Sequence, residues 1–175
     1  MSNVTDELKN ALSSVVSGVG DVASTVQTVA RKNVSQGLQT VGQVVSEGLE
    51  TISSTGTSLT AGVTGLVRGA VDGAKDAGVS TTEAVGEAAS VAVKTASRVG
   101  GDVGEVAVSS VTGAIEAAGD IGGDSGELAK GAVLGILKAA DEIGSEAGSL
   151  VRKALLNAVA LPHDIIDALL TGKTE

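Results

Sequence analysis

The sequence predicts an all-α protein built from tandem amphipathic helical repeats of 22 residues. Residues 101–122 read GDVGEVAVSSVTGAIEAAGDIG and residues 123–144 read GDSGELAKGAVLGILKAADEIG, with eleven of the 22 aligned positions identical. Apolar residues within these units cluster on one side of a helix, without the period-two alternation that a strand requires. Five units also end in Gly, the usual residue just past a helix.

The repeat frame extends in both directions from these two units. Residues 57–78 and 79–100 align without gaps, and neighbouring segments keep the same apolar positions. We therefore expect a polar lead-in at residues 1–12 and then one array over residues 13–166. The array has about seven units, of which the first and the last are degenerate.

Each unit is expected to carry one apolar stripe along a helix. Eleven residues make about three turns at 3.67 residues per turn, so successive half-units return to the same angular position. The charged residues, Asp72 among them, fall on the opposite arc and are expected to face solvent. The stripe is the candidate surface for an apolar ligand or partner, and its members are Val63, Val67, Val71, Val85, Val93, Val111, Ile115, Ile121, Val133, Leu137, Ile143, Leu150 and Leu155.

At the joints between units, residues typical of a helix end and of a helix start recur at the same places of the 22-residue frame. Ser80, Asp102 and Asp124 each precede a Glu by three residues, as N-cap residues do. Two architectures follow: antiparallel helical hairpins packed in a bundle, or a nearly continuous helix that kinks at each joint. We favour the hairpins, with opening to an extended kinked helix as a hypothesis. The joint residues are Gly56, Gly78, Gly100, Gly122 and Gly144.

Glycines inside the units predict close helix contacts. Gly65, Gly69 and Gly73 stand four residues apart, a spacing that lets two helix backbones approach each other. Close contact is needed, because a single unit of small apolar residues cannot offset its own ordering entropy.

The C-terminal segment at residues 149–172 replaces Ala and Gly with Leu and Ile and is broken at Pro162. It has two interpretations: a better-packed unit that caps the array, or a helix that docks on a partner or surface.

Composition excludes several classes of function. The formal charge of −9 and the scattered basic residues argue against nucleic acid as a partner. The chain has no Cys and only one His, His163, so we expect no metal site, no cofactor and no enzymatic activity. The longest uncharged stretch, residues 51–67, is too short and too polar for a membrane span. The lack of Cys and of a signal-peptide pattern favours the cytoplasm.

The stretch VTGLVRGAVDGAKDAGVSTTEAVGEAASVAVKTASRVGG, residues 63–101, carries a resemblance. Its period and composition resemble those of the exchangeable apolipoproteins, the perilipins and the synucleins, which coat lipid surfaces with amphipathic helices. The resemblance covers residues 13–166 and involves no specific motif. It implies a peripheral, lipid-associated protein.

Two functions therefore remain open. In the first, the helices coat an apolar surface such as a lipid droplet, a storage granule or a neutral membrane, with the protein peripheral to it in the cytoplasm. In the second, the protein is a structural scaffold, a homo-oligomer or part of a protein complex, and its helices bury the stripe against each other or a partner.

Overall fold

The computed structural model describes residues 4–13, 19–36, 40–56, 58–158 and 161–171. Every regular element within these ranges is a helix, which confirms the expected all-α class. In chain order the helices are α1 (Val4–Ser13), α2 (Val19–Ser35), α3 (Val41–Thr55), α4 (Leu59–Asp76), α5 (Thr81–Arg98), α6 (Val103–Ile121), α7 (Ser125–Ile143), α8 (Ser145–Asn157) and α9 (His163–Thr171).

Polar side chains mark where the central helices begin. The Ser80 hydroxyl accepts a hydrogen bond from the N–H of Glu83 at 3.3 Å, and the Asp102 carboxylate accepts one from Glu105 at 3.0 Å. The Asp124 carboxylate accepts two N–H groups of the first turn of α7, at 2.8 and 3.1 Å. These contacts satisfy N–H groups that lack a partner within the helix. They confirm the N-caps predicted at these three residues.

Glycines with positive φ mark where the helices end. Gly56, Gly78, Gly100 and Gly122 have φ between 69° and 77°, in the left-handed range that other residues avoid. Gly144 differs, with φ of 147°, and α8 begins directly after it without a side-chain cap. A Cβ at any of these five positions would meet no atom within 4 Å. Backbone conformation, and not crowding, is therefore what favours glycine there.

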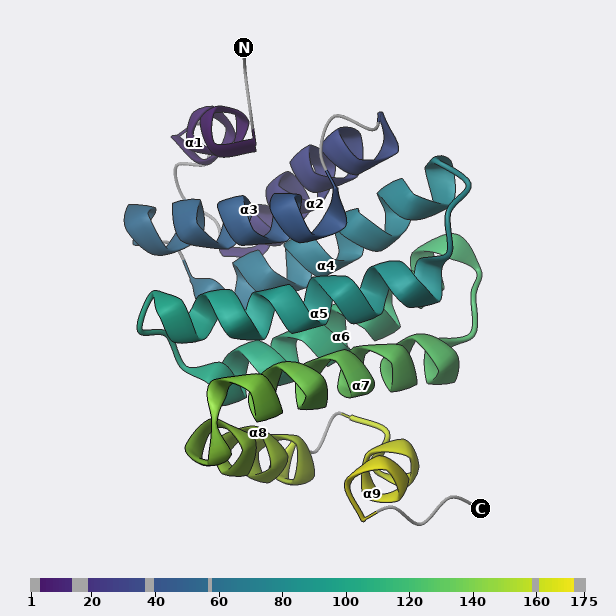
Figure 1. The fold of residues 1–175 in the computed structure, drawn as a ribbon. Helices are drawn as coiled ribbons and strands as arrows, with labels where there is room; N and C mark the ends of the chain where they lie inside the picture. The colour runs from purple at the N-terminus through teal and green to yellow at the C-terminus, as the bar shows by residue number, and fades with distance from the viewer. Residues whose placement is uncertain (1–3, 14–18, 37–39, 57, 159–160, 172–175) are drawn as a thin grey trace.

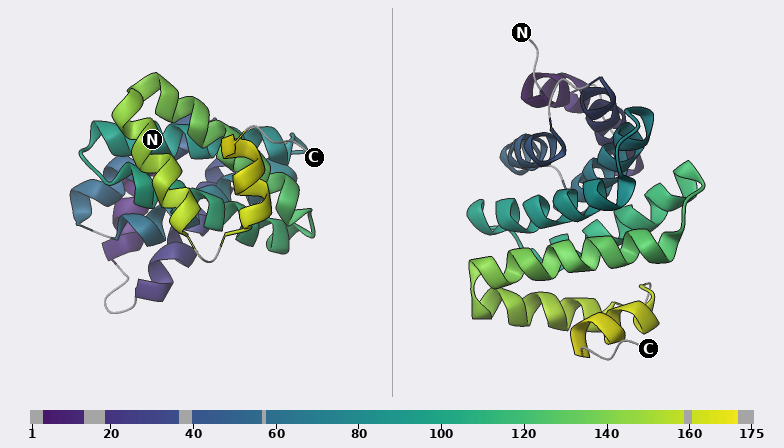
Figure 2. Two further views of the ribbon diagram at one scale, coloured as in Figure 1. Left: turned by 90° about the horizontal axis from the view of Figure 1, so that it is seen from below. Right: turned by 45° about the vertical axis from the view of Figure 1, so that its right-hand side comes forward.

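The chain reverses at each joint, so consecutive helices lie antiparallel in a stack (Figure 1). Helices α2, α4, α6 and α8 form one layer, and α3, α5 and α7 form a second layer packed on it (Figures 1 and 2). Helices two apart in the sequence are thus neighbours within a layer and run parallel. This arrangement is the folded hairpin form and not the kinked rod.

The register between neighbours of a layer follows the sequence repeat. Arg31 binds Asp76 across α2 and α4 at 2.7 Å, and these residues are 45 positions apart. Arg98 binds Glu50 across α5 and α3 at 2.5 Å, with a separation of 48 positions. Two 22-residue units make 44 residues, so each contact joins equivalent places of two units or places up to one turn away.

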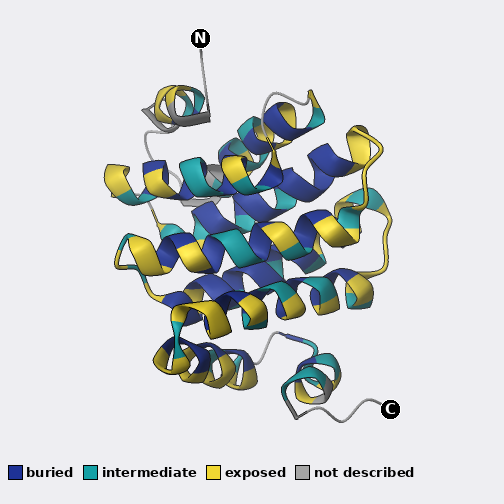
Figure 3. Cartoon of the chain, in the orientation of Figure 1, coloured by how far each residue is buried: buried dark blue, intermediate teal, exposed yellow. Residues whose placement is uncertain are grey.

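The core lies between the two layers and is built from Val, Ala, Leu and Ile (Figure 3). Helices α4 and α6 are the most extensively buried, because each has a neighbour on both sides of its layer and the second layer against it.

The two ends of the array differ from the central repeats. The expected lead-in contains α1, whose Leu8 is fully buried where α1 packs against α2 and α3. At the other end, the Leu-rich segment at residues 149–172 begins inside α8, whose first residue is Ser145. Helix α9 begins directly after Pro162 and packs against α7 and α8.

Candidate functional site

Most of the predicted apolar stripe lies inside the stack. Eight of its thirteen residues have no exposed surface, because the neighbouring helices cover them. These residues are Val63, Val67, Val71, Val85, Val93, Val111, Val133 and Leu155. In the folded chain this part of the candidate surface is the protein's own core.

The other five stripe residues lie nearer the surface. Ile115, Ile121 and Leu137 are partly buried against the core, whereas Ile143 is 36% exposed and Leu150 is 50% exposed. Ile143 is the last residue of α7, and Leu150 lies on α8, the last helix that the described residues add to the layer of α2, α4 and α6. The stripe therefore does not form one continuous exposed face, because the packed helices bury most of its members and leave only a few at the surface.

The three glycines predicted to allow close contact line the side of α4 that faces α2. A Cβ at Gly65 would lie 2.5 Å from the carbonyl oxygen of Ala23. One at Gly69 would lie 2.6 Å from the Cβ of Ala30, and one at Gly73 would lie 2.7 Å from a Cβ of α2. No side chain fits at these distances, so the backbones of α2 and α4 approach each other along three turns.

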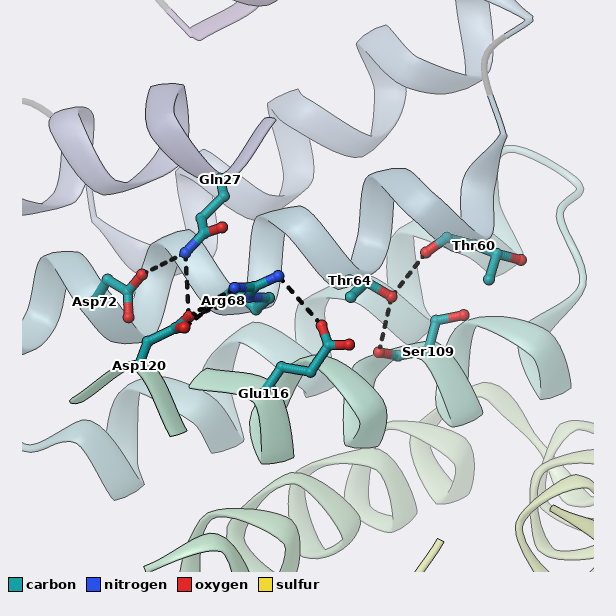
Figure 4. Close-up of polar contacts among 8 residues, drawn as sticks. All are labelled: Gln27, Thr60, Thr64, Arg68, Asp72, Ser109, Glu116 and Asp120. Carbon is teal, nitrogen blue, oxygen red and sulfur yellow. Dashed lines mark hydrogen bonds and ion pairs between the residues drawn. The ribbon is translucent and has the colours of Figure 1, made fainter. Parts of the chain in front are cut away.

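A polar seam connects α2, α4 and α6 beside this contact (Figure 4). We use this name for Gln27, Arg68, Asp72, Glu116 and Asp120. The Gln27 amide donates to Asp72 at 2.6 Å and to Asp120 at 3.2 Å. Arg68 binds Asp120 through two nitrogens at 3.0 to 3.1 Å and Glu116 at 3.4 Å. One residue of α4 thus holds two acids of α6, and one residue of α2 bridges the other two helices.

Asp72 corrects the expectation that all charged residues face solvent. Asp72 is only 2% exposed, because α2 covers the side of α4 that would be free in an isolated helix. Its Oδ2 accepts the bond from Gln27, but within the described residues Oδ1 has no partner. Burial raises the pKa of Asp72, and the nearby charge of Asp120 acts in the same direction.

Further polar contacts extend along the same layer. The Thr64 hydroxyl donates to the carbonyl of Thr60 at 2.9 Å and lies 3.4 Å from that of Ser109 on α6 (Figure 4). At the other end of α4, Lys75 donates to the carbonyl of Ile121 at 2.6 Å. A cation there complements the negative end of the α6 dipole.

The outer surface is uneven near α8. Among the described residues, the large apolar side chains that are exposed are Val79, Leu134, Ile143, Leu150 and Leu156, and four of these five lie on α7 or α8. A hollow of about 530 Å³ lies between α6 and α8, with Leu150 in its wall. A second hollow of about 350 Å³ also contains Leu150, together with Ile143.

The described residues contain no group of three or more His, Asp or Glu side chains placed to hold a metal ion. None of the helices in the described part of the chain is both long and apolar enough to cross a bilayer. Compared with models of known protein families and with curated proteins, the chain matches none.

Sequence reasoning missed the polar seam and the α6–α8 hollow. The seam had a usable signal, since Arg68 and Glu116 are opposite charges 48 residues apart, as are Arg98 and Glu50. Two units plus one turn give this separation. The hollow had no such signal, because it depends on how the side chains of α6 and α8 meet in the folded stack.

Proposed function

We propose that the protein is a non-catalytic helical scaffold, a stack of antiparallel helices that presents its outer surface to other proteins. The observation that carries this proposal is the complete burial of eight stripe residues within the stack. Apolar surface that is already removed from water gains nothing further by contact with lipid. In the folded state the stripe stabilises the array, and partners contact the outside.

The polar seam favours the stacked arrangement of the helices over other arrangements. Gln27, Arg68 and Asp120 connect three helices through hydrogen bonds that need one particular register. A buried or half-buried polar contact favours one arrangement over its neighbours, because a slipped register leaves its groups unpaired.

A second candidate is the coat for an apolar surface, such as a lipid droplet, a storage granule or a neutral membrane. It is favoured by the five glycine joints, because glycine accepts more backbone conformations than other residues and so allows a joint to change its angle. If the helices separated at these joints, the stripe would face outward. Under this candidate the protein is cytoplasmic and peripheral to the surface that it covers.

Far-ultraviolet circular dichroism with a thermal melt, followed by flotation with neutral phosphatidylcholine vesicles and with triglyceride droplets, distinguishes the two candidates. A scaffold is strongly helical alone, melts cooperatively and does not float. Weak helicity that rises with lipid, together with flotation, would overturn the scaffold proposal.

Gly69→Ala provides the matched variant for this experiment, since its Cβ would separate α2 from α4. For a scaffold, the variant loses stability and gains no lipid binding. For a coat, a loosened stack exposes more of the stripe and floats more readily than the wild type.

A further inference from the structure

A groove that contains the exposed side chain of Leu150 crosses the start of α6. The two hollows near α8 meet at Leu150, which lines both of them, and together we call them the Leu150 groove. Val103, Gly104 and Val108 of α6 form part of its wall. Helix α8 packs closely on α6 at Gly104, where an added Cβ would lie 3.0 Å from the Cβ of Ala154, and the groove lies beside this contact.

In the Leu150 groove the larger hollow is lined mainly by apolar atoms and the smaller one equally by polar and apolar atoms, and both have exposed acidic residues at their edge. Leu150 is 50% exposed and Ile143 is 36% exposed. Asp102, Glu105 and Glu146 also line the groove, against a single cation, Lys153. A complementary partner therefore presents an apolar side chain flanked by cations.

The outer face of α7 carries such a pattern. Leu134 is 50% exposed, with Lys130 one turn before it and Lys138 one turn after it, both exposed. Among the described residues neither lysine forms an ion pair. We call these three residues the α7 ridge. Residues four apart lie on the same face of a helix, so the ridge is one knob between two cations.

We propose that the α7 ridge of one copy docks in the Leu150 groove of a second copy. Leu134 would cover Leu150 and Ile143, while Lys130 and Lys138 face the acidic edge. Ridge and groove are different surfaces of the chain, so the contact is heterologous, and each bound copy presents a free ridge at one side and a free groove at the other. The proposal rests on the scaffold function and specifies its partner as the chain itself.

Helix α7 is a rigid carrier for the ridge. An adjacent side of α7 packs against α5 through Gly131 and Gly135, and a Cβ at Gly135 would overlap the backbone of Gly86. The ridge therefore does not have to be ordered when it binds, which reduces the entropic cost of association.

The test uses sedimentation velocity over a concentration series of the full chain, with Leu134→Glu, which damages the ridge, and Leu150→Glu, which damages the groove. We expect the wild type to associate with increasing concentration and each variant to stay monomeric. An equimolar mixture of the two variants should form a one-to-one complex, because one chain retains its groove and the other its ridge. A symmetric contact would not be rescued by mixing.

Val79→Glu is the matched control, since Val79 is 55% exposed at the α4–α5 joint and belongs to neither surface. It should associate like the wild type. If Leu134→Glu loses its helical circular dichroism, the double variant Lys130→Glu, Lys138→Glu replaces it at the ridge. If Leu150→Glu does, Glu105→Lys, Glu146→Lys replaces it at the groove, because reversing exposed charges leaves the core intact.

A wild type that stays monomeric up to about 1 mM, where millimolar dissociation constants still register, would overturn the inference. So would a mixture of variants that remains monomeric, or a Val79→Glu variant that no longer associates. A helical, cooperatively melting monomer would leave the scaffold proposal standing, whereas a chain that folds only on lipid would overturn both.

Discussion

At the scale of single residues, Asp72 has the most unusual environment in the described chain. Asp72 is 2% exposed, and one of its carboxylate oxygens has no partner among the described residues. This burial disfavours the charged form of the side chain. Burial therefore raises its pKa above the ordinary value of 3.8. The folded chain then binds this proton more tightly than the unfolded chain does. The resulting stabilisation is complete below pH 3.8 and is lost as the pH rises through the folded-state pKa.

Asp72→Asn should remove this pH dependence. We expect the variant to be more stable than the wild type at pH 7 by on the order of 1 kcal/mol, because it has no buried charge with an unpaired oxygen. The advantage should shrink as the pH falls towards 4. Urea unfolding of both chains at several pH values measures the difference, in which the titration of all other groups cancels.

Asp76→Asn is the control with the opposite sign. Its hydrogen bond with Arg31 lowers the pKa of Asp76, so its contribution is present above the ordinary carboxyl value and is lost as the pH falls. This variant should be less stable than the wild type at pH 7. If both variants shift stability in the same direction, the environment that we assign to Asp72 is wrong.

At the scale of elements, the contact between α2 and α4 depends on glycine. A Cβ at Gly69 would overlap the backbone of Gln27 and the side chain of Ala30, so Gly69→Ala must push the two helices apart. We expect a loss of about 1–3 kcal/mol in the free energy of unfolding, as for other overpacked sites. Gly119→Ala on α6 is the control, since a Cβ there meets nothing within 4 Å. It should gain about 0.5–1 kcal/mol from the helix propensity of Ala, and denaturant titration of both variants tests the contrast.

The elements show which features of the fold can be predicted from sequence. Helix ends depend on neighbouring residues, so Asp124 as a cap and Gly122 as a stop could be assigned from the sequence. The burial of Asp72 could not, because a helical wheel describes one helix and α4 is covered from several sides. The exposure of Leu150 also depends on the fold, since it follows from which face of α8 the described neighbouring helices cover. Features that depend on residues close in the sequence, such as caps and helix ends, can therefore be predicted from it. Contacts between units cannot be predicted without knowing how the helices are aligned with one another.

Two neighbouring leucines test which face of α8 packs against the core. Leu155 of α8 is fully buried, and the next residue, Leu156, is 43% exposed. Leu155→Ala should cost about 2–5 kcal/mol of unfolding free energy, because it leaves a cavity between α8 and the core. Leu156→Ala should change stability by less than about 0.5 kcal/mol, as is typical of surface positions. Equal effects in urea titrations would mean that α8 packs through a different face.

At the scale of the whole molecule, the fold is a one-dimensional stack. Each helix contacts mainly the helices one and two positions away in the sequence, so stability is shared between neighbours and not concentrated at one centre. Helices α4 and α6 have neighbours in both directions, whereas α1 contacts α2 and α3, and α9 contacts α7 and α8. Releasing an end helix breaks contacts on one side only. Releasing a central helix breaks them on both.

This asymmetry predicts a gradient of hydrogen exchange along the chain. Amides of α4 and α6 should exchange slowest, with protection close to that of global unfolding, and amides of α1 and α9 should exchange fastest through local opening of the ends. Exchange followed by mass spectrometry on peptides from each helix measures the gradient. Uniform protection would mean that the stack opens only as a whole. Fast exchange at α4 with slower exchange at the ends would mean that the array opens at its central joints, which is the motion that a surface coat requires and a scaffold does not.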